Sequence, residues 1–142
     1  PENLGVGKPF DVDERLENFI IAAAAEKTGD RAKAHNLYAS VCDDTAKFRS
    51  AWDSVHLLGA MALRKIGKED DSVRLLAGWQ AARGGDDPVF AWASAKYHGD
   101  EAGAAALLSR MKSSAGGATW DMGTGDRNLF LVIEIISGCI RE

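Results

Sequence analysis

Three glycines recur along the chain where predicted helices end, and their spacing limits the fold more than any other feature. Gly29, Gly67 and Gly99 are separated by 38 and 32 residues, and each follows a stretch with apolar residues at helical spacing. Glycine often ends a helix because it adopts the left-handed backbone conformation without a steric penalty. The spacing therefore predicts pairs of helices joined by short turns and repeated about every 35 residues.

The residues that follow these glycines repeat as well. Small residues stand five positions after them: Ala34, Ser72 and Ala104. Large apolar residues stand 12 positions after them: Val41, Trp79 and Met111. A small side chain lets two antiparallel helices approach closely, and large side chains fill the space between consecutive pairs. We therefore expect each glycine to lie at the turn of a helical hairpin.

With this order of helix, turn glycine, small residue and large residue, the chain resembles the tetratricopeptide repeat family. The resemblance covers about residues 12–114 as three degenerate hairpins. It implies an all-α fold: a right-handed array of antiparallel helix hairpins whose first helices line a concave groove. One subset of the family holds chaperone C-termini with a clamp of Lys, Asn and Arg. The clamp is absent here, because its positions carry Phe19, Ala23, Leu58, Asp86 and Phe90.

The chain is expected to form a single domain of about seven helices. Its expected parts are hairpins over about residues 12–43, 50–83 and 87–114, a glycine-rich loop over 115–126 and a terminal helix over 127–140. Aspartates are expected to cap four of the helices: Asp11 (with Glu14 in a capping box), Asp30, Asp87 before Pro88, and Asp126. The β-branched cluster within residues 128–137 is also compatible with a buried strand, but its length and its cap favour a helix.

The first helices of the three hairpins supply the groove that the resemblance implies. Carried over position by position, its partner-binding residues are Phe19, Ala23, Lys27, Leu57, Met61, Arg64, Lys65, Lys96 and Tyr97. The floor is apolar and the basic residues lie toward the turns, which suits a helix or an extended segment with acidic residues along one flank. Charge reversal at Arg64 and Lys96 should then weaken binding. The cations are equally compatible with a solvated rim that complements the negative helix C-termini.

The terminal helix is apolar around nearly its whole circumference. Between Leu129 and Ile136, Glu134 is the one charged residue. Repeat arrays normally end in a polar face, because an uncovered apolar end aggregates. We therefore expect a second interface at Trp120, Phe130 and Ile133, through which the chain forms a homo- or hetero-oligomer.

Composition and charge exclude several classes of protein. Hydrophobic residues make up 46% of the chain and charged residues 27%, which is typical of a globular domain. The net charge of −4 argues against a nucleic-acid partner, and no apolar stretch is long enough for direct membrane insertion. Cys42 and Cys139 are too few for a disulfide framework, which favours a cytoplasmic location. The chain begins with Pro1 rather than Met, so we expect a processed or excised piece.

Catalytic and metal-binding motifs are not found. No two of His35, His56 and His98 stand four residues apart, so no helical metal pair exists. The loop around DMGTGD lacks the ligand pattern of a calcium loop and the third glycine of a dinucleotide loop. We expect no cofactor and no enzymatic activity. The sequence favours a scaffold, adaptor or chaperone that binds a protein segment, and the alternative is an accessory domain of a larger enzyme or membrane-associated assembly.

Overall fold

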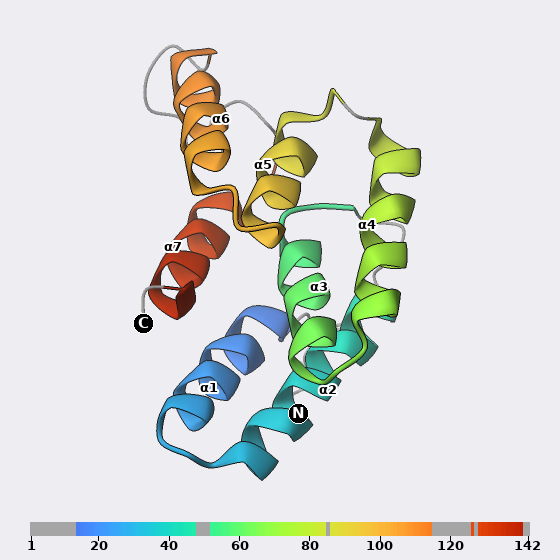
Figure 1. Ribbon diagram of the computed structural model, residues 1–142, viewed down its shortest axis with the longest axis vertical. Helices are drawn as coiled ribbons and strands as arrows, with labels where there is room; N and C mark the ends of the chain where they lie inside the picture. The colour runs from blue at the N-terminus through green and yellow to red at the C-terminus, as the bar shows by residue number, and fades with distance from the viewer. Residues whose placement is uncertain (1–13, 48–51, 85, 115–125, 127, 141–142) are drawn as a thin grey trace, which may run out of the picture.

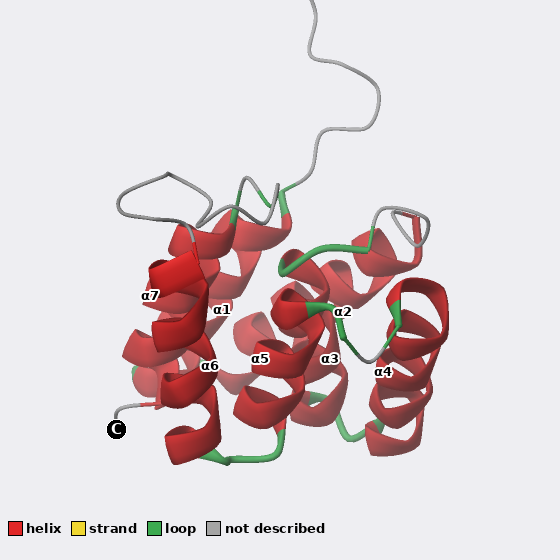
Figure 2. Cartoon of the chain, turned by 90° about the horizontal axis from the view of Figure 1, so that it is seen from above, coloured by secondary structure: helices red, strands yellow, loops and turns green. Residues whose placement is uncertain are grey.

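The chain is all-helical in the part that the structure describes. The computed structural model describes residues 14–47, 52–84, 86–114, 126 and 128–140, and no strand occurs among them (Figures 1 and 2). The helices are α1 (Arg15–Lys27), α2 (Arg31–Lys47), α3 (Val55–Lys65), α4 (Glu69–Arg83), α5 (Pro88–Tyr97), α6 (Glu101–Ser114) and α7 (Leu129–Ile140). The all-α prediction is confirmed, and the ambiguous β-branched segment is a helix.

The three turn glycines adopt the left-handed backbone conformation that the sequence predicted for them. The φ angles of Gly29, Gly67 and Gly99 are +87°, +83° and +78°. After each glycine, the next N–H donates to a carbonyl five residues earlier, as from Asp30 to Ala25 at 2.9 Å. The same bond closes α3 and α5, at 2.8 Å in both turns. A side chain at these positions would cost about 1–2 kcal/mol, because the left-handed conformation crowds Cβ.

Aspartates cap two of the helices as expected. The Asp87 carboxylate accepts a hydrogen bond from the Val89 N–H at 2.9 Å, at the start of α5. Asp30 accepts one from the Lys33 N–H at 3.1 Å, at the start of α2. Helix α1 starts at Arg15 without a side-chain cap, and Asp11 lies outside the described residues.

Helix α3 is the centre of the packing. It contacts α1, α2, α4, α5 and α7, while α1 packs with α2 and α5 with α6. The small residues at the repeated positions, Ala34, Ser72 and Ala104, are buried, and so are Ala22 and Ala60, seven residues before Gly29 and Gly67. Gly59 shows how close α2 and α3 come, because a Cβ there would lie 2.7 Å from Thr45 Cγ2. Small residues thus set the distance between neighbouring helices.

Helix α7 returns to the beginning of the chain. It packs against α1 and α3, and Figure 1 shows it (red) beside α1 (blue). Its side chains Leu129, Val132 and Ile136 are fully buried. We expected an oligomer partner to cover the apolar terminal helix. One stripe of this helix is instead covered by the chain itself.

Candidate functional site

The residues expected to form the floor of a groove are buried in the described structure. Phe19, Leu57 and Met61 are at most 7% exposed, and Tyr97 is 3% exposed. Ala23 is also buried. Because α7 packs on α1 and α3, the chain's own terminal helix covers part of the face that the groove would use. Partner binding at these residues stays a prediction. It would require these buried side chains to become accessible to the partner.

Three of the expected groove cations contact acceptors within the chain. Lys65 Nζ lies 2.9 Å from Glu26 Oε1, and Lys96 Nζ lies 2.7 Å from a Glu101 oxygen. The Arg64 guanidinium donates to the Tyr97 carbonyl oxygen at 2.8 Å. It also lies over the Tyr97 ring, 4.1 Å from the centroid. These contacts favour the alternative in which the cations complement carboxylates and carbonyls near helix ends. Lys27 is exposed near the end of α1.

The start of α7 is attached to the start of α3 through Asp126. Its carboxylate accepts hydrogen bonds from Ser54 N at 2.6 Å and Ser54 Oγ at 2.9 Å. It also accepts one from the Asn128 N–H at 3.1 Å, so its bond lies one residue before α7, the helix that Asp126 was expected to cap. Burial raises the pKa of Asp126 above its ordinary value of 3.8, although the bonds from Ser54 act in the opposite direction. No local sequence pattern indicates that Ser54 is its partner.

Most of the large exposed apolar side chains lie on α1 and α7, two helices that pack against each other. Among the described residues, the large exposed ones are Ile20, Ile21, Val73, Phe130 and Leu131. Four of these five lie on the two adjacent helices, at 40–51% exposure, and Val73 lies on α4. Phe130 belonged to the expected second interface, while Ile133 is half-buried and Trp120 lies outside the described residues. Sequence reasoning missed Ile20 and Ile21, although helical spacing places them away from the buried Ala22 and Phe19.

We call this region the α1–α7 surface and define it by six residues. They are Glu17, Ile20 and Ile21 on α1, and Phe130, Leu131 and Glu134 on α7. All six side chains are exposed. Apolar groups clustered on adjacent helices and rimmed by polar residues are typical of protein interaction sites.

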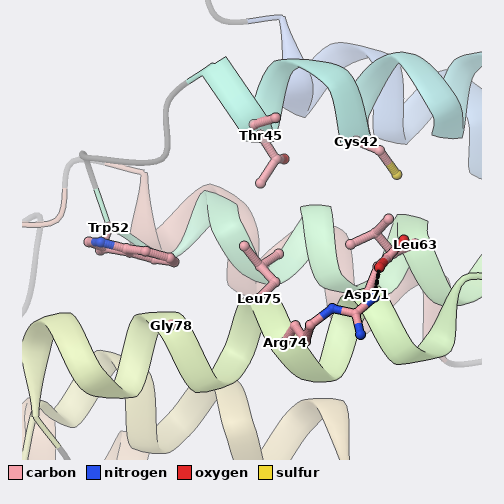
Figure 3. A pocket seen from close by; sticks show the side chains of 9 residues that line it. Cys42, Thr45, Trp52, Leu63, Asp71, Arg74, Leu75 and Gly78 are labelled. Carbon is pink, nitrogen blue, oxygen red and sulfur yellow. Dashed lines mark hydrogen bonds and ion pairs between the residues drawn. The ribbon is translucent and has the colours of Figure 1, made fainter.

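A cleft lies between α2 and α4, and Leu63 of α3 also lines it. Figure 3 shows this cleft, of about 470 Å³, with Cys42 and Thr45 on α2 facing Leu75 and Gly78 on α4. The indole of Trp52 closes one end, and an ion pair of Asp71 with Arg74 lies toward the other. The Trp52 ring lies against Gly78, where an added Cβ would come within 3.3 Å of the indole. The cleft is lined mainly by apolar groups, and the guanidinium of Arg74 is already paired with the carboxylate of Asp71.

Cys42 in this cleft is not set up as a nucleophile. Burial, and next the charge of Asp43, raise the pKa of the Cys42 thiol from 9.0 to about 11. The thiolate is the reactive form, so at neutral pH the side chain is a thiol of low reactivity. This is the environment of a packing residue rather than a catalytic one.

The histidines do not form a metal centre in the described part of the chain. His56 is fully buried, its Nδ1 lies 3.4 Å from an Asp53 carboxylate oxygen, and its ring packs beside Trp52 and Trp79. His35 and His98 are exposed. No group of three potential ligands from His, Cys, Asp or Glu is close enough to bind a metal ion among the described residues.

Comparisons with protein families, with curated proteins and with solved structures give no match for this chain. Within the described residues, no helix combines the length and apolar character needed to cross a membrane.

Proposed function

We propose that this chain is a non-catalytic protein-interaction module that binds a partner through the α1–α7 surface. The observation that carries the proposal is the gathering of four of the five large exposed apolar side chains of the described residues on two adjacent helices. Burial of an exposed apolar group by a partner stabilises the complex by about 25 cal/mol for each Å² of apolar surface removed from water. A surface of this kind favours association rather than chemistry.

The helical hairpins are the proposed scaffold of this module. The repeated turn at Gly29, Gly67 and Gly99 and the repeated burial of small residues support a tetratricopeptide-like array. In this proposal, α7 takes part of the concave face, and the partner binds at the outer side of α1 and α7. The site therefore differs from the groove that the resemblance implies.

A photo-crosslinking residue placed at single surface positions tests the proposal. It should replace Ile20 or Phe130 in turn, with Val73 as the matched control because its exposure is similar, at 52%. In extracts of cells that express the protein, we expect one protein to crosslink at positions 20 and 130 and not at 73. No adduct at either position, or the same adducts at position 73, would contradict the proposal.

A further inference from the structure

We infer that the partner of the α1–α7 surface is an amphipathic segment whose apolar side chains are flanked by lysine or arginine; this inference rests on the proposed function. On α1, Glu17 precedes Ile20 and Ile21 by three and four positions. On α7, Glu134 follows Leu131 and Phe130 by three and four positions. Residues with this spacing are neighbours on one helix face, so each apolar pair lies beside a glutamate.

The two glutamates have no cationic partner within the described residues. Neither Glu17 nor Glu134 takes part in any of the ion pairs or hydrogen bonds found there. Glu26, on the same helix α1, differs because it accepts from Lys65 and from the Tyr38 hydroxyl at 3.0 Å. The negative charge beside the exposed apolar groups is therefore available to a partner.

Charge complementarity selects the partner. A cation opposite an exposed carboxylate adds a modest attraction, accelerates association and disfavours partners of the wrong sign. The partner charge is then opposite to that expected from the sequence, where basic groove residues suggested an acidic segment. Arg64, Lys65 and Lys96, on which that expectation rested, contact acceptors of their own chain.

The same charges disfavour two other occupants of this surface. In a two-fold dimer, identical surfaces meet, so Glu17 and Glu134 of both copies would enter one interface of a chain with net charge −4. An anionic lipid surface would repel the same carboxylates. A basic amphipathic segment meets neither obstacle.

Two synthetic peptides test the inference. Both carry leucines at the same i, i+3, i+4 and i+7 positions, and the flanking positions are lysine in one and glutamate in the other. Each is titrated into the ¹⁵N-labelled chain, and the amide shifts of Ile20, Ile21, Phe130 and Leu131 are followed. We expect the lysine peptide to bind about tenfold more tightly, with a preference that weakens as salt rises.

Charge reversal supplies the matched control. The double variant Glu17→Lys/Glu134→Lys should lose the preference for the lysine peptide. Asp43→Lys/Asp70→Lys has the same change in net charge at exposed positions on α2 and α4, and it should keep the preference. Thermal melts of both variants check that the fold is intact.

Four results would overturn the inference: equal affinity for the two peptides, no shift of these amides by the lysine peptide, a dimer formed through this surface in sedimentation, or binding of anionic vesicles through it. Equal affinity at this surface would leave the proposed function standing. The proposed function fails separately, when neither position 20 nor position 130 yields a crosslinked protein.

Discussion

The carboxylate of Asp126 accepts two hydrogen bonds from Ser54, from its backbone N–H at 2.6 Å and from its hydroxyl at 2.9 Å. The two residues are 72 positions apart in the sequence. Ser54 stands at the start of α3 and Asp126 just before α7, so this contact attaches the last helix to the central one. The bonded groups are both buried, so the contact lies inside the packed structure.

Replacing the Asp126 carboxylate should loosen α7. In Asp126→Ala, the buried Ser54 N–H and hydroxyl lose their acceptor, which should lower the free energy of unfolding by about 1–3 kcal/mol. Asp126→Asn retains one acceptor oxygen and should cost less. Urea denaturation of the two variants measures the difference, and hydrogen exchange should show weaker protection in α7 of the alanine variant. Equal stability of the two variants would contradict this role.

The same carboxyl should give the stability a defined pH dependence. Because burial raises the pKa of Asp126 in the folded chain, the folded chain binds a proton there at a higher pH than the unfolded chain does. The ionised group thus costs stability at neutral pH, and this cost disappears as the pH falls through the raised pKa toward 3.8. Relative to Asp126→Asn, the wild-type chain should gain stability between pH 7 and pH 4. Because both proteins share all other carboxylates, the comparison isolates the effect of Asp126. A loss of wild-type stability relative to Asp126→Asn in acid would contradict a raised pKa for Asp126.

Arg64 should contribute to stability more than its neighbour Lys65. Arg64 bonds to the Tyr97 carbonyl and lies over the Tyr97 ring, which joins α3 to the end of α5. We expect Arg64→Ala to lower the free energy of unfolding by about 1–2 kcal/mol. Lys65→Ala removes an exposed ion pair with Glu26 and should cost at most about 0.5 kcal/mol. Equal effects in denaturant titrations would show that the Arg64 contacts are not stabilising.

The Cys42 thiol should react slowly with alkylating reagents. With a pKa of about 11, it is nearly all protonated at neutral pH. In a Cys139→Ser background, the rate of iodoacetamide modification should rise about tenfold for each pH unit up to about pH 10. Mass spectrometry under native conditions measures this rate. A rate that levels off below pH 9 would mean that the thiol lies in a different environment.

Local features of the fold could be predicted because they depend on short stretches of chain. Gly29, Gly67 and Gly99 terminate helices through their own backbone freedom, and Asp87 with Pro88 starts one through a neighbouring N–H. The burial of Trp79 also followed from its repeated position 12 residues after a turn glycine. Each of these signals acts within one or two helical turns.

The location of the candidate site could not be predicted in the same way. Helix α7 buries the stripe opposite its one charged residue, Glu134, but no pattern within α7 indicates that α1 and α3 cover this stripe. The contact that joins the start of α7 to the start of α3 is between Asp126 and Ser54, which are 72 positions apart in the sequence. Once Leu129, Val132 and Ile136 are buried, Phe130 and Leu131 must face outward. Likewise, Arg64 contacts Tyr97 at the end of α5, and no local sequence pattern indicates this contact.

Binding of the crosslinked partner to purified variants is the most direct test of whether the partner binds at the α1–α7 surface. The partner recovered through position 20 or 130 is titrated calorimetrically into wild-type protein, the double variant Ile20→Ser/Phe130→Ser, and the control Val73→Ser. We predict that the double variant binds at least about tenfold more weakly, because two apolar anchors are lost, while Val73→Ser binds like wild type. Unchanged affinity in the double variant, with its fold intact in a thermal melt, would contradict the assignment of the α1–α7 surface.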